Sequence, residues 1–114
     1  MATITVNLSG TTPQRVTPAL DALGKQTRID SLIIANTHNA TIGVKVFLDT
    51  DGAGANPDYY ILGGASASHR LATGYSIDVF ENTPFEIPSS TAIWVSLTAN
   101  TASAICNYVT IDNF

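Results

Sequence analysis

The sequence predicts one all-β domain, a two-layer antiparallel β-sandwich of jelly-roll-like or immunoglobulin-like type. Three observations predict it. The chain has 114 residues, which is room for one domain. Its hydrophobic residues recur with a period of two almost everywhere, as in strands with one buried face. The alternating segments, about seven or eight of them, are short and separated by turn residues, and no helix of three turns is indicated.

The first strand is predicted where Ile4, Val6 and Leu8 alternate with Thr and Asn. Further strands are predicted at 26–36, 42–48, 59–62, 75–80, 93–98 and 105–111, with a proline-flanked edge segment at 84–88. Residues 36–39 have the composition of a turn. Inward-facing residues of these strands are expected to form much of the core: Ile34, Val44, Val46, Ile77, Val79, Val95, Leu97, Val109 and Ile111.

Residues 11–24 have mixed propensity, with Pro13, Pro18, a possible helical turn at 18–23 and Gly24 as a stop. We therefore expect an N-terminal strand or arm at 1–24 and a β-sandwich domain at 25–114. Such an arm looks separable from the sandwich. It could add a strand to the sheet edge of a neighbouring molecule.

The charge content narrows the range of partners. Charged residues make up 12% of the chain and the net charge is −4, whereas an average soluble domain is about 25% charged. The basic residues are scattered: Arg15, Lys25, Arg28, Lys45 and Arg70. Nucleic acid and anionic membranes need clustered cations, so neither is an expected partner. No apolar run approaches the ~20 residues of a membrane span, and the N-terminus lacks a signal-peptide pattern. Synthesis in a cytoplasm is expected.

No catalytic constellation is found, because a nucleophile, a base and an orienting acid do not occur together in a recognised pattern. His38 lies in the predicted turn and His69 follows a run of small residues. Glu81 and Glu86 flank a proline and are equally well explained as solvated charges. Cys106 is the single cysteine and has no basic neighbour to favour a thiolate. We expect no enzyme activity and no cofactor.

The segment from Asp49 to Asp58 is the one candidate for a metal site. Asp49, Asp51 and Asp58 could supply carboxylate ligands to Ca²⁺. An EF-hand loop beginning at Asp49 would need an oxygen ligand where Ala53 stands and Glu where Tyr60 stands. A polar connection between two strands explains the same residues, and we predict no metal.

The aromatic residues are the candidates for an interface. Four of them lie on the phase opposite the aliphatic stripes of their strands, and adjacent tyrosines cannot both face the core. The candidates are Phe47, Tyr59, Tyr60, Phe80, Trp94 and Tyr108. One interpretation is a contact face, where aromatic residues are enriched. The other is an outer face covered by a loop or arm of the same chain or of another subunit.

From Ile29 onward, a strand ending in IIAN is followed by VKVFL at Val44–Leu48, then by YYI at 59–61 and IWVSL at 93–97. In this order the sequence resembles small β-sandwich virion proteins of tailed bacteriophages. The resemblance implies a virion structural protein, assembled in the bacterial host cytoplasm.

Members of that group are head decoration (cement) proteins, tail or baseplate accessory domains, and fibre attachment domains. We expect the first of these roles, with the major capsid protein or other virion proteins as partners. A homo-oligomer is also expected, and the three-fold positions of icosahedral lattices make it a trimer. The alternative is a tail, baseplate or fibre domain that binds a receptor or a carbohydrate, with Tyr59, Tyr60 and Trp94 stacking on sugar rings.

Overall fold

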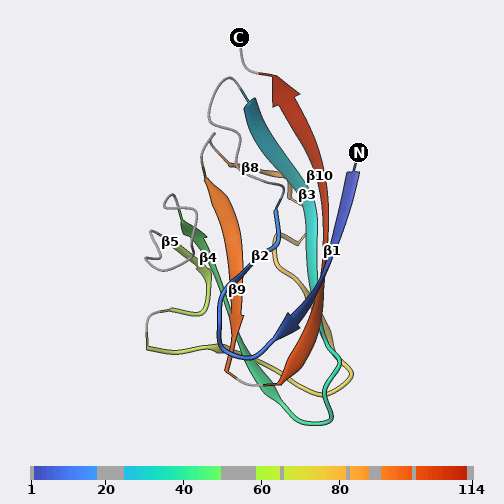
Figure 1. Ribbon diagram of the computed structural model, residues 1–114, viewed down its shortest axis with the longest axis vertical. Coiled ribbons are helices and arrows are strands. Elements are labelled where there is room, and N and C mark those ends of the chain that lie inside the picture. Colours follow the sequence, from blue (N-terminus) through green and yellow to red (C-terminus); the bar gives the residue numbers. More distant parts are fainter. Residues whose placement is uncertain are drawn as a thin grey trace.

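The computed structural model describes residues 2–17, 25–49, 59–64, 66–81, 83–87, 91–98 and 100–112 (Figure 1). These residues form ten strands and no helix, which confirms the predicted all-β class. Sheet A contains β1 (Ala2–Ser9), β10 (Thr101–Asp112), β3 (Lys25–Asn36), β7 (Ser76–Asp78) and β8 (Phe85–Ile87). Sheet B contains β2 (Gln14–Arg15), β9 (Ala92–Leu97), β4 (Ile42–Asp49), β5 (Tyr59–Leu62) and β6 (His69–Leu71). All pairings are antiparallel.

The strand order is that of a jelly roll. The strands β7 and β8 both pair with β3, while β5 and β6 both pair with β4, so each couple acts as one interrupted strand. When each couple is counted as one strand, the chain crosses between the sheets at every connection except the one from β4 to β5. An immunoglobulin sandwich, with strands ABED in one sheet and CFG in the other, instead keeps three of its six connections within a sheet. Of the two predicted topologies, the jelly roll is therefore the one adopted.

One hydrophobic core fills the space between the sheets. Its buried members are Leu8, Val16, Ile29, Leu32, Ile34, Ile42, Val44, Val46, Leu71, Ile87, Ile93, Val95, Leu97, Ala102, Ala104 and Cys106. Five of the predicted core residues are among them, and Ile77 and Val79 are partly buried against the same cluster. The side chain of Ile111 lies outside the described residues. Val109 is half-buried and is not part of the cluster.

The prediction for β10 was wrong in phase. Ala102, Ala104 and Cys106 face the core, whereas Ile105 is 39% exposed. The reason is steric. Each of these small residues lies between two large inward residues of its neighbours, as Ala104 does between Val6 and Ile34. The large side chains of the flanking strands β1 and β3 fill the core at this point, so the inward residues of β10 between them must be small.

A bulge in β3 keeps the two long strands in phase. Asn107 lies opposite Ser31 and Tyr108 lies opposite Ile29, so Asp30 is the additional residue. Arg28 Nε donates a hydrogen bond of 2.9 Å to Asp30 Oδ1. The bulge allows Ile29 and the next inward residues of β3 to remain in the core on both sides of it.

The N-terminal residues belong to both sheets. β1 pairs with β10 over its whole length, and β2 pairs with β9. Leu8 and Val16 are buried in the common core. Residues 2–17 therefore pack as part of the sandwich, and the predicted boundary at residue 24 lies outside the described residues. The possible helical turn at 18–23 lies outside the described residues.

The predicted turn after β3 is held by one buried amide. Asn36 Nδ2 donates to the carbonyl oxygens of Ala40 and Leu71, each at 2.9 Å. Asn36 Oδ1 accepts a hydrogen bond from the backbone N–H of His38 at 2.8 Å. The side chain thus satisfies backbone groups of the β3–β4 turn and of β6 together, and Asn36 is only 5% exposed.

Candidate interaction surfaces

A row of large side chains crosses the outer face of sheet B. The register places Arg15 of β2 opposite Trp94 of β9, Trp94 opposite Phe47 of β4, and Phe47 opposite Tyr60 of β5. The residues that alternate with them on β4 and β9, such as Val46 and Val95, face the core. The predicted outward phase of Phe47 and Trp94 is therefore confirmed.

Pointing outward does not leave these aromatic residues accessible. Phe47 is 2% exposed and Trp94 is 9% exposed, and with Ala92 they form a second cluster separate from the main core. Trp94 Nε1 is buried and has no hydrogen-bond partner. Most of the surface of this pair is already covered, so the row reinforces sheet B. A role for Phe47 and Trp94 in an interface remains a prediction.

Tyr60 of β5 ends this row, and its neighbour Tyr59 lies opposite Leu48 on the alternate phase. Tyr59 is 71% exposed and Tyr60 is 36% exposed. The Tyr60 ring lies 5.8 Å from the Phe47 ring at an angle of 59°, a tilted arrangement that is typical of favourable aromatic pairs. Tyr59 lies on the edge strand of sheet B and is the more exposed of the two.

Two of the predicted outer-face aromatics, Phe80 and Tyr108, pack against the core instead. For Phe80 the reason is that β7 ends at Asp78. A turn follows, in which the Glu81 N–H donates to Asp78 O at 3.3 Å, and the alternation stops there. The Phe80 ring stacks on Phe85 with centroids 4.9 Å apart. For Tyr108 the reason is the inward phase of β10 described above.

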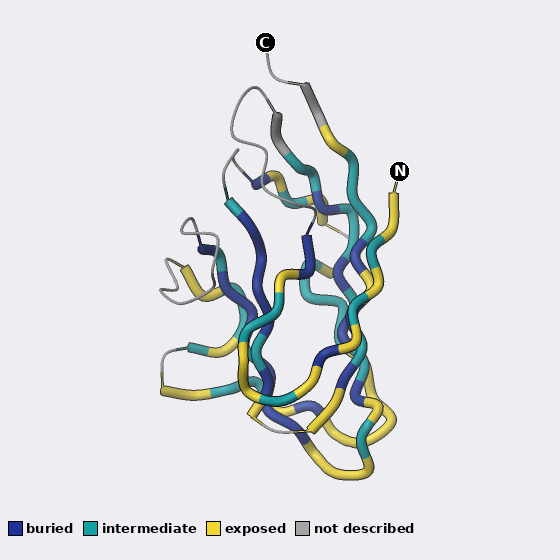
Figure 2. Tube along the Cα trace, viewed as in Figure 1, coloured by how far each residue is buried: buried dark blue, intermediate teal, exposed yellow. Residues whose placement is uncertain are grey.

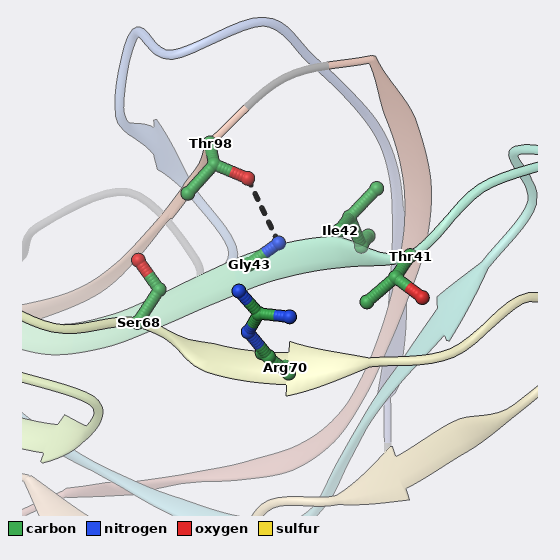
Figure 3. A pocket seen from close by; sticks show the side chains of 6 residues that line it. All are labelled: Thr41, Ile42, Gly43, Ser68, Arg70 and Thr98. Atoms are coloured by element: carbon green, nitrogen blue, oxygen red, sulfur yellow. Dashed lines mark hydrogen bonds between the residues drawn. The ribbon is translucent and has the colours of Figure 1, made fainter.

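A polar groove lies beside the row on sheet B. A cavity of about 300 Å³ is lined by Thr41, Ile42, Gly43, Ser68, Arg70 and Thr98, as Figure 3 shows. A second cavity of about 260 Å³ shares Ser68 and Thr98 with it and adds Thr11, Lys45, Ser96 and Leu97. The two form one surface that presents hydroxyl groups and two cationic side chains.

Gly43 makes this groove possible. Its N–H donates to Thr98 Oγ1 at 2.8 Å, and its carbonyl accepts from the Thr98 N–H at 2.9 Å (Figure 3). A Cβ at this position would lie 2.6 Å from Thr98 Cγ2 and 2.7 Å from Ser68 Cβ. Any larger residue would push Thr98 and Ser68 away from β4.

The outer face of sheet A has a different composition. The outward positions of β1, β10 and the 31–35 part of β3 carry no charged residue: Thr3, Thr5, Asn7, Ser9, Thr101, Ser103, Ile105, Asn107, Ser31, Ile33 and Ala35. Ile105 lies at the centre of this uncharged face, opposite Thr5 and Ile33. Among the described residues, charged side chains border this face at Asp78 on β7 and at Arg28, Asp30 and Glu86.

Part of this face is held by a chain of hydrogen bonds across three strands. Thr3 Oγ1 donates to Asn107 Oδ1 at 2.7 Å, and Asn107 Nδ2 donates to Ser31 Oγ at 2.8 Å. The polar groups of these side chains are therefore oriented in advance. Sequence reasoning did not single out this face, although the alternating Thr, Asn and Ser of the first strand were its signal.

The residues considered for catalysis lie apart from one another. His38 is in the β3–β4 turn, His69 is in β6, and Glu86 is exposed on β8 opposite Arg28. Glu81 sits in the turn after β7 with a φ of 51°. Cys106 faces the core, where burial raises the pKa of its thiol from 9.0 to about 11. None of these groups is placed to activate another.

The metal candidates divide between described and undescribed residues. Asp49 ends β4 and is 1% exposed, whereas Asp51 and Asp58 lie outside the described residues. Within the described part of the chain, no group of three His, Cys, Asp or Glu side chains could hold a metal ion. Nor does that part include a helix with the length and apolarity needed to cross a membrane.

No family model matches the chain, and no curated protein is similar enough to match. Among solved structures, a chain from the structure of infectious bursal disease virus Gx strain matches with 14% identity and a TM-score of 0.42. The match covers 98% of this chain and 30% of that one, so the present chain spans under a third of its length. A similarity this low says nothing about what the present chain does.

Proposed function

We propose that this chain is a non-enzymatic virion structural protein that acts as a capsid decoration, or cement, protein and bridges neighbouring capsomers. The observation that carries the proposal is the uncharged outer face of sheet A. Burying a charge without a partner is expensive, whereas hydroxyl and amide groups can exchange water for protein partners at a modest cost. The face can therefore be covered by another virion protein with little loss.

Two further features support a virion role. The jelly roll is a recurrent fold of viral capsid domains, although it also occurs in lectin domains and cupins, so this support is an analogy at the level of fold. The sequence from Ile29 onward also resembles small virion proteins of tailed bacteriophages. A cement function requires contact area and no chemistry. The expected partner is the major capsid protein, and the expected location is the virion.

The test is an add-back experiment with particles that lack the protein. Ile105→Lys places a charge at the centre of the uncharged face, and Tyr75→Lys places one on a 67% exposed side chain at the turn between β6 and β7. We expect the first variant to lose co-sedimentation with particles and the second to bind like the wild type. Equal binding by both variants would contradict the proposal. Imaging that places the protein on the tail would refute the capsid location.

The polar groove of sheet B favours a second candidate function, a tail or fibre domain that binds an acidic carbohydrate. Arg70 forms no ion pair within the described part of the chain, and hydroxyl groups surround it (Figure 3). A glycan array with the isolated protein tests this role. Arg70→Gln should lose any specific binding, whereas Arg28→Gln, which breaks the distant pair with Asp30, should retain it. Of the tyrosines and tryptophan considered for sugar stacking, Tyr59 is exposed enough to stack on a sugar ring, whereas Trp94 is too buried to do so.

A further inference from the structure

β1 is the longest unprotected edge in the described part of the sandwich. Its eight residues pair with β10 on one side only. The other edge strands are much shorter: β2 has two residues, β5 has four, and β6, β7 and β8 have three each. Natural edge strands usually carry a charge, a proline or a bulge that prevents pairing with another chain. β1 carries none of these, and its register with β10 is continuous.

The hydrogen bonds of Gln14 show which backbone groups face the free side. The Ser9 N–H donates to Gln14 Oε1 at 2.8 Å, and Gln14 Nε2 donates to the Asn7 carbonyl at 3.3 Å. Both groups therefore point away from β10. Because the N–H and C=O of one residue point to the same side and successive residues alternate, Thr3 and Thr5 also direct theirs outward. No partner is described for these groups on that side.

The inner face of the same segment is incompletely covered. Leu8 is 1% exposed, but Val6 and Ile4 are only half-buried and Ala2 is exposed. Figure 2 shows this change along β1 toward the N-terminus. Unpaired backbone groups and uncovered apolar side chains thus coincide at Ala2–Val6, which is the signature of a strand that another strand would complete.

We propose that β1 pairs with β1 of a second copy of this chain, antiparallel about a two-fold axis at Ile4. Thr3 of each copy then lies opposite Thr5 of the other, and each such pair exchanges two backbone hydrogen bonds, about four in total. Ala2 lies opposite Val6 of the second copy. The bond from Gln14 already occupies the Asn7 carbonyl, which favours this register over one that needs Asn7.

A second copy is the occupant that this edge fits best. The segment has no charge to repel itself. In the two-fold register, apolar side chains lie beside apolar ones and polar side chains beside polar ones. Ile4 and Val6 extend the inner apolar layer, while Thr3 and Thr5 extend the uncharged outer face. The two A sheets become one continuous sheet, as an isologous interface requires. This assembly is a dimer and differs from the trimer expected from lattice symmetry. It does not rest on the proposed function.

Charge placement tests the register directly. Thr3→Lys with Thr5→Lys puts lysine opposite lysine across the axis, whereas Thr3→Lys with Thr5→Glu puts each lysine opposite a glutamate. Like charges directly opposite destabilise a pair and opposite charges stabilise it. Measured by analytical ultracentrifugation at low salt, the wild type should be dimeric, the first variant at least tenfold weaker, and the second as tight as the wild type. Circular dichroism and a thermal melt check that both variants fold.

Hydrogen exchange supplies a second measurement that needs no variant. The amides of Thr3 and Thr5 should become protected as the protein concentration rises, while those in exposed turns should not. A wild type that stays monomeric at its highest soluble concentration would overturn the proposal, even if a strand from another virion protein bound the same edge. A trimer would also overturn it, as would a dimer that both double variants retain equally.

Discussion

The outer faces of the two sheets follow the same alternation of inward and outward residues, but they differ in how exposed their outward side chains are. On sheet B the outward residues of the central strands include Phe47 and Trp94, and both are nearly inaccessible. On sheet A the outward residues of the central strands include Ile105, which is solvent-exposed and surrounded by hydroxyl and amide groups. The direction of a side chain in a strand therefore does not decide its exposure. Large aromatic groups make sheet B thicker, and small polar groups leave sheet A available to a partner.

Alanine substitution at the centre of each face should show the largest difference. Trp94→Ala removes a large side chain that is only 9% exposed. We expect a loss of about 3–5 kcal/mol in the free energy of unfolding. Ile105→Ala removes a partly exposed side chain and should cost about 1 kcal/mol or less. Urea unfolding followed by circular dichroism measures both. Equal losses would show that the two faces are not different.

Trp94→Phe is the control for this comparison. It keeps an aromatic ring in the cluster and removes the Nε1–H group, which is buried without a partner. An unsatisfied buried donor costs about 1–3 kcal/mol, so its removal offsets part of the lost packing. The variant should be much more stable than Trp94→Ala. If it is equally unstable, the indole has a partner.

Most of the fold was predictable because hydrophobic and polar residues alternate along the longer strands. The period of two placed β1, β3, β4, β9 and β10, and it separated inward from outward residues on β4 and β9. It could not give the phase of β10, where small residues face inward because the neighbouring strands supply the volume. That is a property of three strands together. The short strands β2 and β6 were missed because two or three residues cannot show a period.

The candidate surfaces were less predictable. Six aromatic residues were candidates for an interface, but a phase argument cannot show what lies above an outward residue, nor that β7 ends before Phe80. Gly43 and Gln14 were missed for a related reason. The first matters through two residues far away in the sequence, and the second through backbone groups of β1. Neither contact has a local pattern.

Substitution of Gly43 should have the next largest effect, and it acts on sheet B. Gly43→Ala brings a Cβ within 2.6 Å of Thr98 Cγ2, and overpacking of this kind costs about 1–3 kcal/mol. Gly64→Ala is the matched control, because its Cβ would meet no atom within 4 Å and its φ is not positive. That variant should be neutral or slightly stabilising. Thermal unfolding compares the two, and similar melting temperatures would show that Thr98 and Ser68 yield easily.

On sheet A, Asn107→Ala should have a smaller effect. It removes two side-chain hydrogen bonds, to Thr3 and to Ser31, in a partly exposed position. Each such bond contributes about 1 kcal/mol or less, because water replaces the lost partner. We expect a total loss below about 2 kcal/mol by urea unfolding. A larger loss would mean that the uncharged face is a structural network as tightly coupled as the aromatic row of sheet B.

The smallest expected effect is a dependence of stability on alkaline pH, and it concerns the inner side of sheet A. Burial raises the pKa of the Cys106 thiol to about 11 from 9.0. Between these values the folded protein holds a proton that the unfolded chain has released. Stability contributed by the neutral thiol is therefore complete below pH 9 and is lost as the pH rises toward 11. Other groups titrate in this range, so the difference between the wild type and Cys106→Ala isolates the thiol, and it should shrink across this window.

A transferred thiol separates the two sides of the same strand. In a Cys106→Ala background, Ser103→Cys places the only thiol on the outer face of β10, three residues away and on the opposite phase. At pH 8 a thiol reagent should label this variant rapidly and label the wild type at least tenfold more slowly, because the buried group is neither accessible nor ionised. Equal rates would mean that β10 opens locally often enough to expose its inner face. The inward phase of Ala102, Ala104 and Cys106 would then fail to protect the strand, and the contrast between the two sides of sheet A would be lost.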